Sequence, residues 1–288
     1  MLRHTATPVT DGVCEHGEGP VWDARSEVLR YVDMLRGDVM AFDPTTGALA
    51  RTHVADVVAA LRPRTGGGWV VAVERGFALT EPGSWRPGPV IEAFTDPGVR
   101  MNDGGCDAAG GFLCGTMAYD HTPGAGTLFR LAPDGTIGVV LRGVTISNGF
   151  CLDPAGSRAY YADTPTGRVD VFDVGPDGAT LTNRRPFVTL EDGAGWPDGL
   201  TVDAEGGVWV ALYGGGAVRG YRPDGRLAHV VRLATPHVTA CAFGGQDLGD
   251  LYITTTQERI DTSRDRLAGA LFHARPGVRG LPPRPYAG

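Results

Sequence analysis

The sequence predicts an all-β fold, a six-bladed β-propeller, and three observations lead to it. The 288-residue chain contains 44 Gly and 21 Pro, spread along its length rather than gathered in one linker. Short apolar runs of β-strand character alternate with these turn residues, and no stretch shows the period of a long helix. Two short signatures also recur at intervals of roughly 40–50 residues, the length of one four-stranded blade.

The first signature has an oxygen-bearing residue, an Asp five positions later and a small residue eight positions later. Asn102 begins one copy, Asn148 begins the next 46 residues later, and Asp198 follows after a further 50. A related copy near the start begins at Glu18. Each copy precedes a strand-like run, and these runs are Leu29–Asp33, Phe112–Met117, Ala159–Asp163 and Val208–Tyr213.

The second signature is a strand that begins at a Gly or Ala and runs into a Pro, Asp or Gly turn. Its copies begin at Gly37, Gly76, Gly126, Gly167, Ala217 and Gly269, of which the second is the weakest. Six copies predict six blades, so residues 1–288 form a single domain. We expect N-terminal residues around Thr5–Cys14 to pair into the last blade and close the ring.

Composition excludes several functional classes. The net charge of −7 argues against a nucleic-acid-binding surface. All 26 basic residues are Arg, which excludes Schiff-base and phosphate-loop lysines. The five Cys show no C-x-x-C spacing, so neither a zinc knuckle nor a disulfide framework is expected. No signal peptide or membrane-spanning run is visible, and we expect a cytoplasmic protein with no membrane partner.

The first signature also indicates a metal site on the central axis. Equivalent positions in successive blades lie at equal heights around the channel, so Glu18, Asn102, Asn148 and Asp198 form a ring at one mouth. Two of the chain's three Asn fall in this ring. Converging carboxylate and amide oxygens suit one divalent cation, Ca²⁺, Mg²⁺, Mn²⁺ or Zn²⁺. The competing interpretation is that Asn and Asp before Gly are turn residues, but it does not explain four such residues in register.

Five ordered segments resemble the gluconolactonase/regucalcin (senescence marker protein) family, and the resemblance runs from about Glu15 to Phe272. The segments are His16-Gly-Glu-Gly-Pro-Val-Trp22, Arg100-Met-Asn-Asp-Gly104, Gly115-Thr-Met-Ala118, Ile146-Ser-Asn-Gly149 and Pro197-Asp-Gly-Leu-Thr-Val-Asp-Ala-Glu-Gly206. The resemblance implies a six-bladed propeller with one divalent metal on its axis. It also implies a metal-dependent hydrolase that opens sugar lactones such as gluconolactone.

Carried over position by position, Glu18, Asn148 and Asp198 match the family's metal ligands, and Asp198 also matches its catalytic general base. The implied reaction is polarisation of the lactone carbonyl by the cation and attack by a water that Asp198 deprotonates. Activation of the water by the cation itself is the alternative, because a carboxylate cannot be a tight bidentate ligand and an effective base together.

Arg100 and Asn102 match family positions that bind sugar hydroxyls. Asp120 falls where many members have Glu as a further substrate contact, and this difference leaves the identity of the sugar open. The following stretch, residues 121–126, is predicted to be a loop over the mouth. Trp196, beside Asp198 in the sequence, is a candidate wall of the pocket.

The expected partner is a small-molecule lactone, and we expect a monomer. An enzymatic alternative keeps the same site but acts on a non-sugar lactone, another ester or a phosphoester, because a fold does not fix a substrate. A second alternative is a non-catalytic calcium-binding regulator, and a third is a protein-interaction propeller. The set of Arg100, Asn102 and Asp120 argues against a pure ion binder, and the ring of oxygens argues against a purely protein-binding role.

Overall fold

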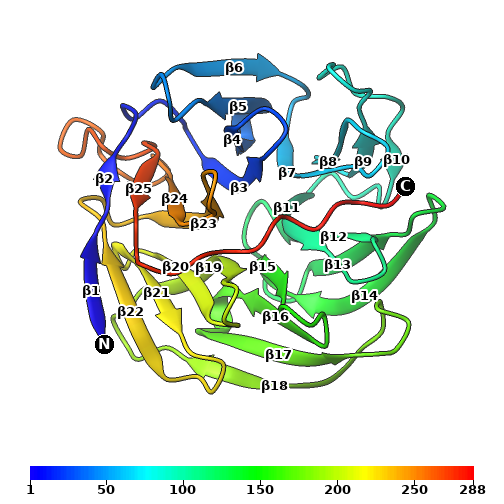
Figure 1. Ribbon diagram of the computed structural model, residues 1–288. Coiled ribbons are helices and arrows are strands. Elements are labelled where there is room, and N and C mark those ends of the chain that lie inside the picture. The colour runs from blue at the N-terminus through cyan, green and yellow to red at the C-terminus, as the bar shows by residue number, and fades with distance from the viewer.

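The predicted propeller is confirmed by the computed structural model, which describes all of residues 1–288. Six sheets, each of at least four strands, surround a central axis (Figure 1). Blade one contains β3 (Gly17–Asp23), β4 (Val28–Asp33), β5 (Asp38–Phe42) and β6 (Leu49–His53). Blade two contains β7 (Val58–Pro63), β8 (Trp69–Val73), β9 (Gly76–Leu79) and β10 (Ile91–Glu92). Blade three contains β11 (Val99–Cys106), β12 (Phe112–Ala118), β13 (Gly126–Leu131) and β14 (Ile137–Val144).

Blades four to six complete the circle, and two short 3₁₀ turns, η1 (Met34–Arg36) and η2 (Thr164–Thr166), are the helical elements. Blade four contains β15 (Ser147–Leu152), β16 (Arg158–Asp163), β17 (Arg168–Val174) and β18 (Leu181–Thr189). Blade five contains β19 (Trp196–Val202), β20 (Val208–Tyr213), β21 (Ala217–Tyr221) and β22 (Leu227–Arg232). Blade six contains β23 (Val238–Gly244), β24 (Asp250–Thr255) and β25 (Phe272–Ala274). Neither 3₁₀ turn approaches the length or apolarity that crossing a bilayer requires.

The N-terminal segment joins two blades. Strand β2 (Thr7–Pro8) pairs antiparallel with β25 and is the fourth strand of blade six. Strand β1 (Leu2–Thr5) pairs in parallel with β22 and adds a fifth strand to blade five, a feature that the sequence did not predict. Because β1 covers the outer edge of blade five, the backbone groups along β22 are paired rather than exposed.

The recurring signature is explained by one turn that repeats from blade to blade. The Asp at its second position accepts backbone N–H bonds, as Asp107 does from Gly111 and Asp203 does from Gly207, both at 2.7 Å. The residue at its third position has a positive φ, 77° at Gly110 and 82° at Gly206, which glycine adopts without a steric penalty. The second and third positions therefore build the turn, and only the first position remains available for function.

A register shift interrupts the pairing of the innermost strand with its neighbour in every blade, and in four blades it falls at a residue of the predicted ring. In blade one the shift lies between Glu18 and Val21, and in blade five between Pro197 and Leu200. Bulges of this kind bend a strand and redirect its side chains. The inner strands are also almost wholly buried, so the ring is carried on a rigid frame.

After β25 the chain crosses the axis at one end of the propeller (Figure 1). It is fastened on the far side by Tyr286, whose side chain is 1 % exposed and whose hydroxyl donates to the Ala132 carbonyl at 2.8 Å. The Tyr286 amide also donates to the Pro63 carbonyl at 2.8 Å, so the segment reaches blades two and three. We call residues 275–288 the C-terminal strap.

Candidate functional site

Five of the six site residues predicted from the sequence line one pocket at the mouth opposite the C-terminal strap. We call it the upper pocket, and its volume is about 250 Å³. Four different blades supply these side chains through their innermost strands: Glu18 from β3, Arg100 and Asn102 from β11, Asn148 from β15 and Asp198 from β19. All five are at least nine-tenths buried.

A chain of hydrogen bonds runs through three blades along the floor of this pocket. Arg100 Nη1 donates to Asn102 Oδ1 at 2.7 Å, and Asn102 Nδ2 donates to Asn148 Oδ1 at 3.2 Å. Asn148 Nδ2 donates to Thr164 Oγ1 at 2.8 Å, and Thr164 in turn donates to the Pro197 carbonyl at 2.8 Å. The chain fixes the Asn148 amide and ends at the residue before Asp198.

Two carboxyl groups of the upper pocket, Glu18 and Asp198, are deprived of water, and burial outweighs the effect of the one arginine that acts on Glu18. Burial, with the charge of nearby Asp103 as a second cause, raises the pKa of Glu18 to about 8. Burial and then the charge of Glu18 raise the pKa of Asp198 well above its ordinary value. Asp198 Oδ1 is also buried without a hydrogen-bond partner, a costly condition for a polar atom.

The donor set is one that suits a hard divalent cation. Glu18 Oε2 accepts a bond from the Gly19 amide at 2.8 Å, whereas no bond occupies Asp198 Oδ1. Asn148 presents an amide oxygen beside them. No group of three or more His, Cys, Asp or Glu side chains has metal-site geometry anywhere in the chain. Two carboxylates together with an amide oxygen nevertheless fit a cation that prefers oxygen ligands.

Arg100 brings a buried positive charge to the same pocket without a carboxylate partner. Its Nη1 donates to Asn102 and to the Met101 carbonyl, the latter at 3.0 Å, and it forms no ion pair. Burial lowers the pKa of Arg100. Its guanidinium lies over the ring of Tyr119, 5.9 Å from the centroid. Remaining N–H groups of this arginine can therefore donate to a ligand.

Asp120, the sixth predicted residue, lies outside the set that lines the pocket. It is exposed, and its Oδ1 accepts bonds from the Thr122 amide at 2.9 Å and the Thr122 hydroxyl at 2.7 Å. The neighbouring His121, with φ of 63°, lines the pocket instead. Trp196 lines it as expected, and its side chain is 51 % exposed.

Sequence reasoning missed the contribution of blade six. The segment between β24 and β25, residues 256–271, is a long loop that we call the blade-six loop, and it brings Glu258 and Arg259 into the pocket lining. His16, also in the lining, lies with Nδ1 3.4 Å from Glu258 Oε2. These residues fall outside both repeated signatures, so the repeat gave no signal for them.

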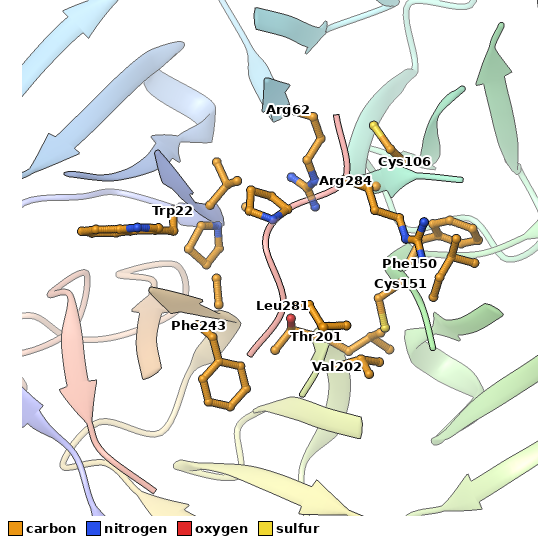
Figure 2. A pocket seen from close by; sticks show the side chains of 18 of the residues that line it. Trp22, Arg62, Cys106, Phe150, Cys151, Thr201, Val202, Phe243, Leu281 and Arg284 are labelled. Carbon is orange, nitrogen blue, oxygen red and sulfur yellow. The ribbon is translucent and has the colours of Figure 1, made fainter. Parts of the chain in front are cut away.

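At the other end of the channel a second cavity of about 410 Å³ lies beneath the C-terminal strap (Figure 2). Apolar side chains such as Phe150 and Val202 form much of its wall, and Arg62 and Arg284 lie at its edge. Leu281 and Arg284 belong to the strap, which passes through the middle of the view. The strap therefore lies across this end of the channel. The ring of oxygens lies at the other end, in the upper pocket.

Comparison with known proteins decides the family. The family profile described as "SMP-30/Gluconolactonase/LRE-like region" matches residues 16–257. The chain belongs to this SMP-30/gluconolactonase/LRE-like family. The resemblance found in the sequence is thereby confirmed.

Members of the SMP-30/gluconolactonase/LRE-like family match the chain over nearly its full length. Regucalcin of Danio rerio is 34% identical over 281 residues, covering 95% of each chain. Pentonolactonase XacC of Haloferax volcanii is 35% identical over 292 residues, covering 96% of this chain and 97% of its own. The crystal structure of a regucalcin from Agrobacterium tumefaciens superposes with a TM-score of 0.92 at 24% identity over 99% of both chains, which shows the shared fold.

Proposed function

We propose that the chain hydrolyses sugar lactones in the upper pocket, with one divalent cation held by Glu18, Asn148 and Asp198. The observation that carries the proposal is the buried, unpartnered Oδ1 of Asp198, beside a second buried carboxyl group and an oriented amide oxygen. A sugar-lactone substrate is supported by membership of a family with gluconolactonase in its name and by the similarity to a pentonolactonase.

Bound at these oxygens, a divalent cation supplies positive charge that offsets the two carboxylates and polarises a carbonyl oxygen. The protein's own side chains then bind and orient the substrate and transfer the proton. Arg100 and Asn102 bind and orient the ring hydroxyls, and the hydrogen-bond chain through Asn148 and Thr164 keeps the pocket floor in one arrangement. Such positioning lowers the entropic barrier to reaction.

Asp198 accepts the proton that a water molecule gives up as its oxygen attacks the lactone carbonyl carbon. The bond between that carbon and the ring oxygen breaks, and the proton returns to the ring oxygen, which leaves as a hydroxyl. The product is the open-chain hydroxy acid. Asp198 Oδ1 suits this role, because it is buried in the pocket and no hydrogen bond occupies it.

Base consumption in a pH-stat with a panel of aldonolactones tests the proposal. The protein is stripped with a chelator and then supplied separately with Ca²⁺, Mg²⁺, Mn²⁺ or Zn²⁺. We expect turnover above the spontaneous rate only after a cation is restored, and its loss in Asp198→Ala. Asp134→Ala, an exposed turn carboxylate of blade three, is the matched control and keeps its activity.

A calcium-binding role without catalysis is the second candidate, favoured by the similarity to a protein named regucalcin. The arrangement of Arg100 and Asn102 speaks for catalysis, because an ion-binding site needs no hydroxyl-binding groups beside it. Calorimetric titration with Ca²⁺ separates the two candidates. Binding that depends on Asp198, together with no acceleration of any lactone or ester, supports the regulator and contradicts the hydrolase.

A further inference from the structure

We propose that Glu258, carried on the blade-six loop, is the carboxylate that accepts hydrogen bonds from substrate hydroxyls and so selects polyhydroxylated lactones over lactones without hydroxyls. This inference rests on the proposed lactonase function and names the residue that gives it selectivity. Blade six faces blade three across the axis of a six-bladed ring, so Glu258 approaches a substrate from the side opposite Asn102.

The loop of blade three, residues 119–125, brings no carboxylate into the pocket. Asp120 is exposed, outside the pocket lining, and its carboxylate is bonded to Thr122 within its own turn. The residue that enters the pocket from this loop is His121, whose Nε2 lies 3.2 Å from Arg259 Nη2 of the blade-six loop. These two loops therefore meet over the mouth, and the carboxylate they bring to the pocket comes from blade six.

Glu258 is held in place from three directions. His16, itself 7 % exposed, lies beside its carboxylate, and the Glu258 amide donates to Thr256 Oγ1 at 2.9 Å. The Glu258 carbonyl lies 3.0 Å from His237 Nδ1. The two backbone contacts fix where the residue lies, and the contact with His16 restrains its side chain, so Glu258 loses little freedom when it binds a ligand, as a selectivity group requires.

The ionised state of the Glu258 carboxylate suits it to accept hydrogen bonds from hydroxyl groups. The hydrogen bond from His16 is the main cause that lowers the pKa of Glu258 to about 2, so the group is ionised at any ordinary pH. Its charge contributes to the raised pKa of Asp198 and opposes the effect of burial on the pKa of Arg100, so Glu258 interacts electrostatically with both groups. The side chain remains 34 % exposed, so oxygen surface is available to a ligand.

An ionised carboxylate accepts hydrogen bonds and cannot donate one. It therefore binds hydroxyl donors through charge-assisted bonds, which are about twice as strong as neutral ones. A lactone ring without hydroxyls displaces water from the exposed part of this carboxylate and offers no hydrogen-bond donor in exchange, and the site discriminates against it for that reason. The ligand class that Glu258 fits is a neutral, polyhydroxylated lactone.

The test compares D-glucono-δ-lactone with δ-valerolactone, which has the same ring size and no hydroxyl groups. We expect Glu258→Ala to lower kcat/KM for the sugar lactone by about 10- to 100-fold, the value of a charge-assisted bond. The same change leaves kcat/KM for δ-valerolactone within about twofold. Glu258→Gln, which keeps one neutral acceptor, falls between wild type and Ala. Asp261→Ala, an exposed carboxylate in the same loop, is the matched control and behaves as wild type.

A second readout avoids turnover altogether. Anhydro-D-glucitol has the ring hydroxyls of the sugar and no carbonyl, and its binding is followed by tryptophan fluorescence because Trp196 lines the pocket. We expect Glu258→Ala to weaken this binding by the same factor, about 10- to 100-fold.

Equal losses on both lactones, no loss on either, or the selective loss appearing in Asp120→Ala instead would overturn the assignment while leaving the lactonase function standing. Failure of the wild-type protein to open any lactone overturns the proposed function, and the assignment of Glu258 falls with it.

Discussion

Asn102 and Asn148, the inner-strand asparagines of blades three and four, are hydrogen-bonded to each other at 3.2 Å from Nδ2 to Oδ1. This bond, together with the one that Asn148 Nδ2 donates to Thr164, fixes the orientation of the Asn148 amide. Because Asn148 gives its own N–H to Thr164, its oxygen, which accepts the bond from Asn102 and has a second lone pair, is the atom that would contact the proposed cation. A hydroxyl on η2 therefore controls the orientation of an amide on β15, whose oxygen belongs to the proposed ligand set.

Removing that hydroxyl tests the relationship. Thr164→Val keeps the shape of the side chain but leaves the Asn148 N–H group without its acceptor. We expect cation affinity, measured by calorimetric titration of chelator-stripped protein, to fall by about 10- to 100-fold. Thr166→Val is the matched control, because Thr166 lies on the same 3₁₀ turn and bonds only to backbone carbonyls. An equal loss in both variants would show that the turn as a whole, rather than the Thr164 hydroxyl, supports the site.

The cation-free protein is expected to lose stability as the pH rises from about 4.5 to about 8. Glu18 has an ordinary pKa of 4.5 and a folded-state pKa of about 8, so between these values the folded state keeps a proton that the unfolded state has released. Unfolding then becomes easier with rising pH, by about 1.4 kcal/mol for each unit of the pKa difference. Asp198, whose pKa is also raised, acts in the same direction.

Urea unfolding at several pH values, with chelator and with saturating cation, measures this effect. The cation removes the slope, because it replaces the proton as the partner of the carboxylates. Glu18→Gln has a shallower slope than the wild type in chelator. The pKa of Glu258, lowered to about 2, places its titration below this pH range. A slope that is the same in wild type and Glu18→Gln contradicts the assignment to Glu18.

The repeat made the ring predictable. Because the turn Asp and the turn Gly recur at fixed distances, they identify the position in each inner strand that faces the channel, and Glu18 and Asp198 could be placed at one height from spacing alone. The order of the strands in each blade follows from the same repetition.

What lies outside the repeat could not be predicted. Glu258 belongs to a loop whose length is not repeated in other blades, and its place over the pocket depends on contacts with His16 and His237, distant in sequence. The Asp120 carboxylate accepts its bonds from Thr122 in its own turn and lies outside the pocket lining, which the family position alone could not indicate. Strand β1 was missed because parallel pairing at the edge of blade five leaves no pattern in four residues, of which three are exposed.

Substitution of the signature glycine tests the turn. Gly206 has φ of 82°, and an added Cβ would lie 3.3 Å from Pro223. We expect Gly206→Ala to lower the free energy of unfolding by about 1–2 kcal/mol, the cost of a left-handed backbone for an L-residue. Gly138, on exposed strand β14 with open space around its Cα, is the matched control, and Gly138→Ala is neutral or slightly stabilising. A similar loss at both positions, measured by urea unfolding, contradicts the conformational argument.

The C-terminal strap is expected to stabilise the propeller without serving the upper pocket. Tyr286 is 1 % exposed and packs into the apolar cluster of blades one to three. We expect Tyr286→Ala to lower the free energy of unfolding by about 3–5 kcal/mol, as for other buried aromatic residues. Tyr286→Phe removes only the bond to the Ala132 carbonyl and costs about 1 kcal/mol. Because Tyr286 lies at the far end of the channel from Asp198, kcat/KM of the folded Phe variant stays at the wild-type value. A selective fall in kcat/KM with unchanged stability would instead show that the two ends of the channel are coupled.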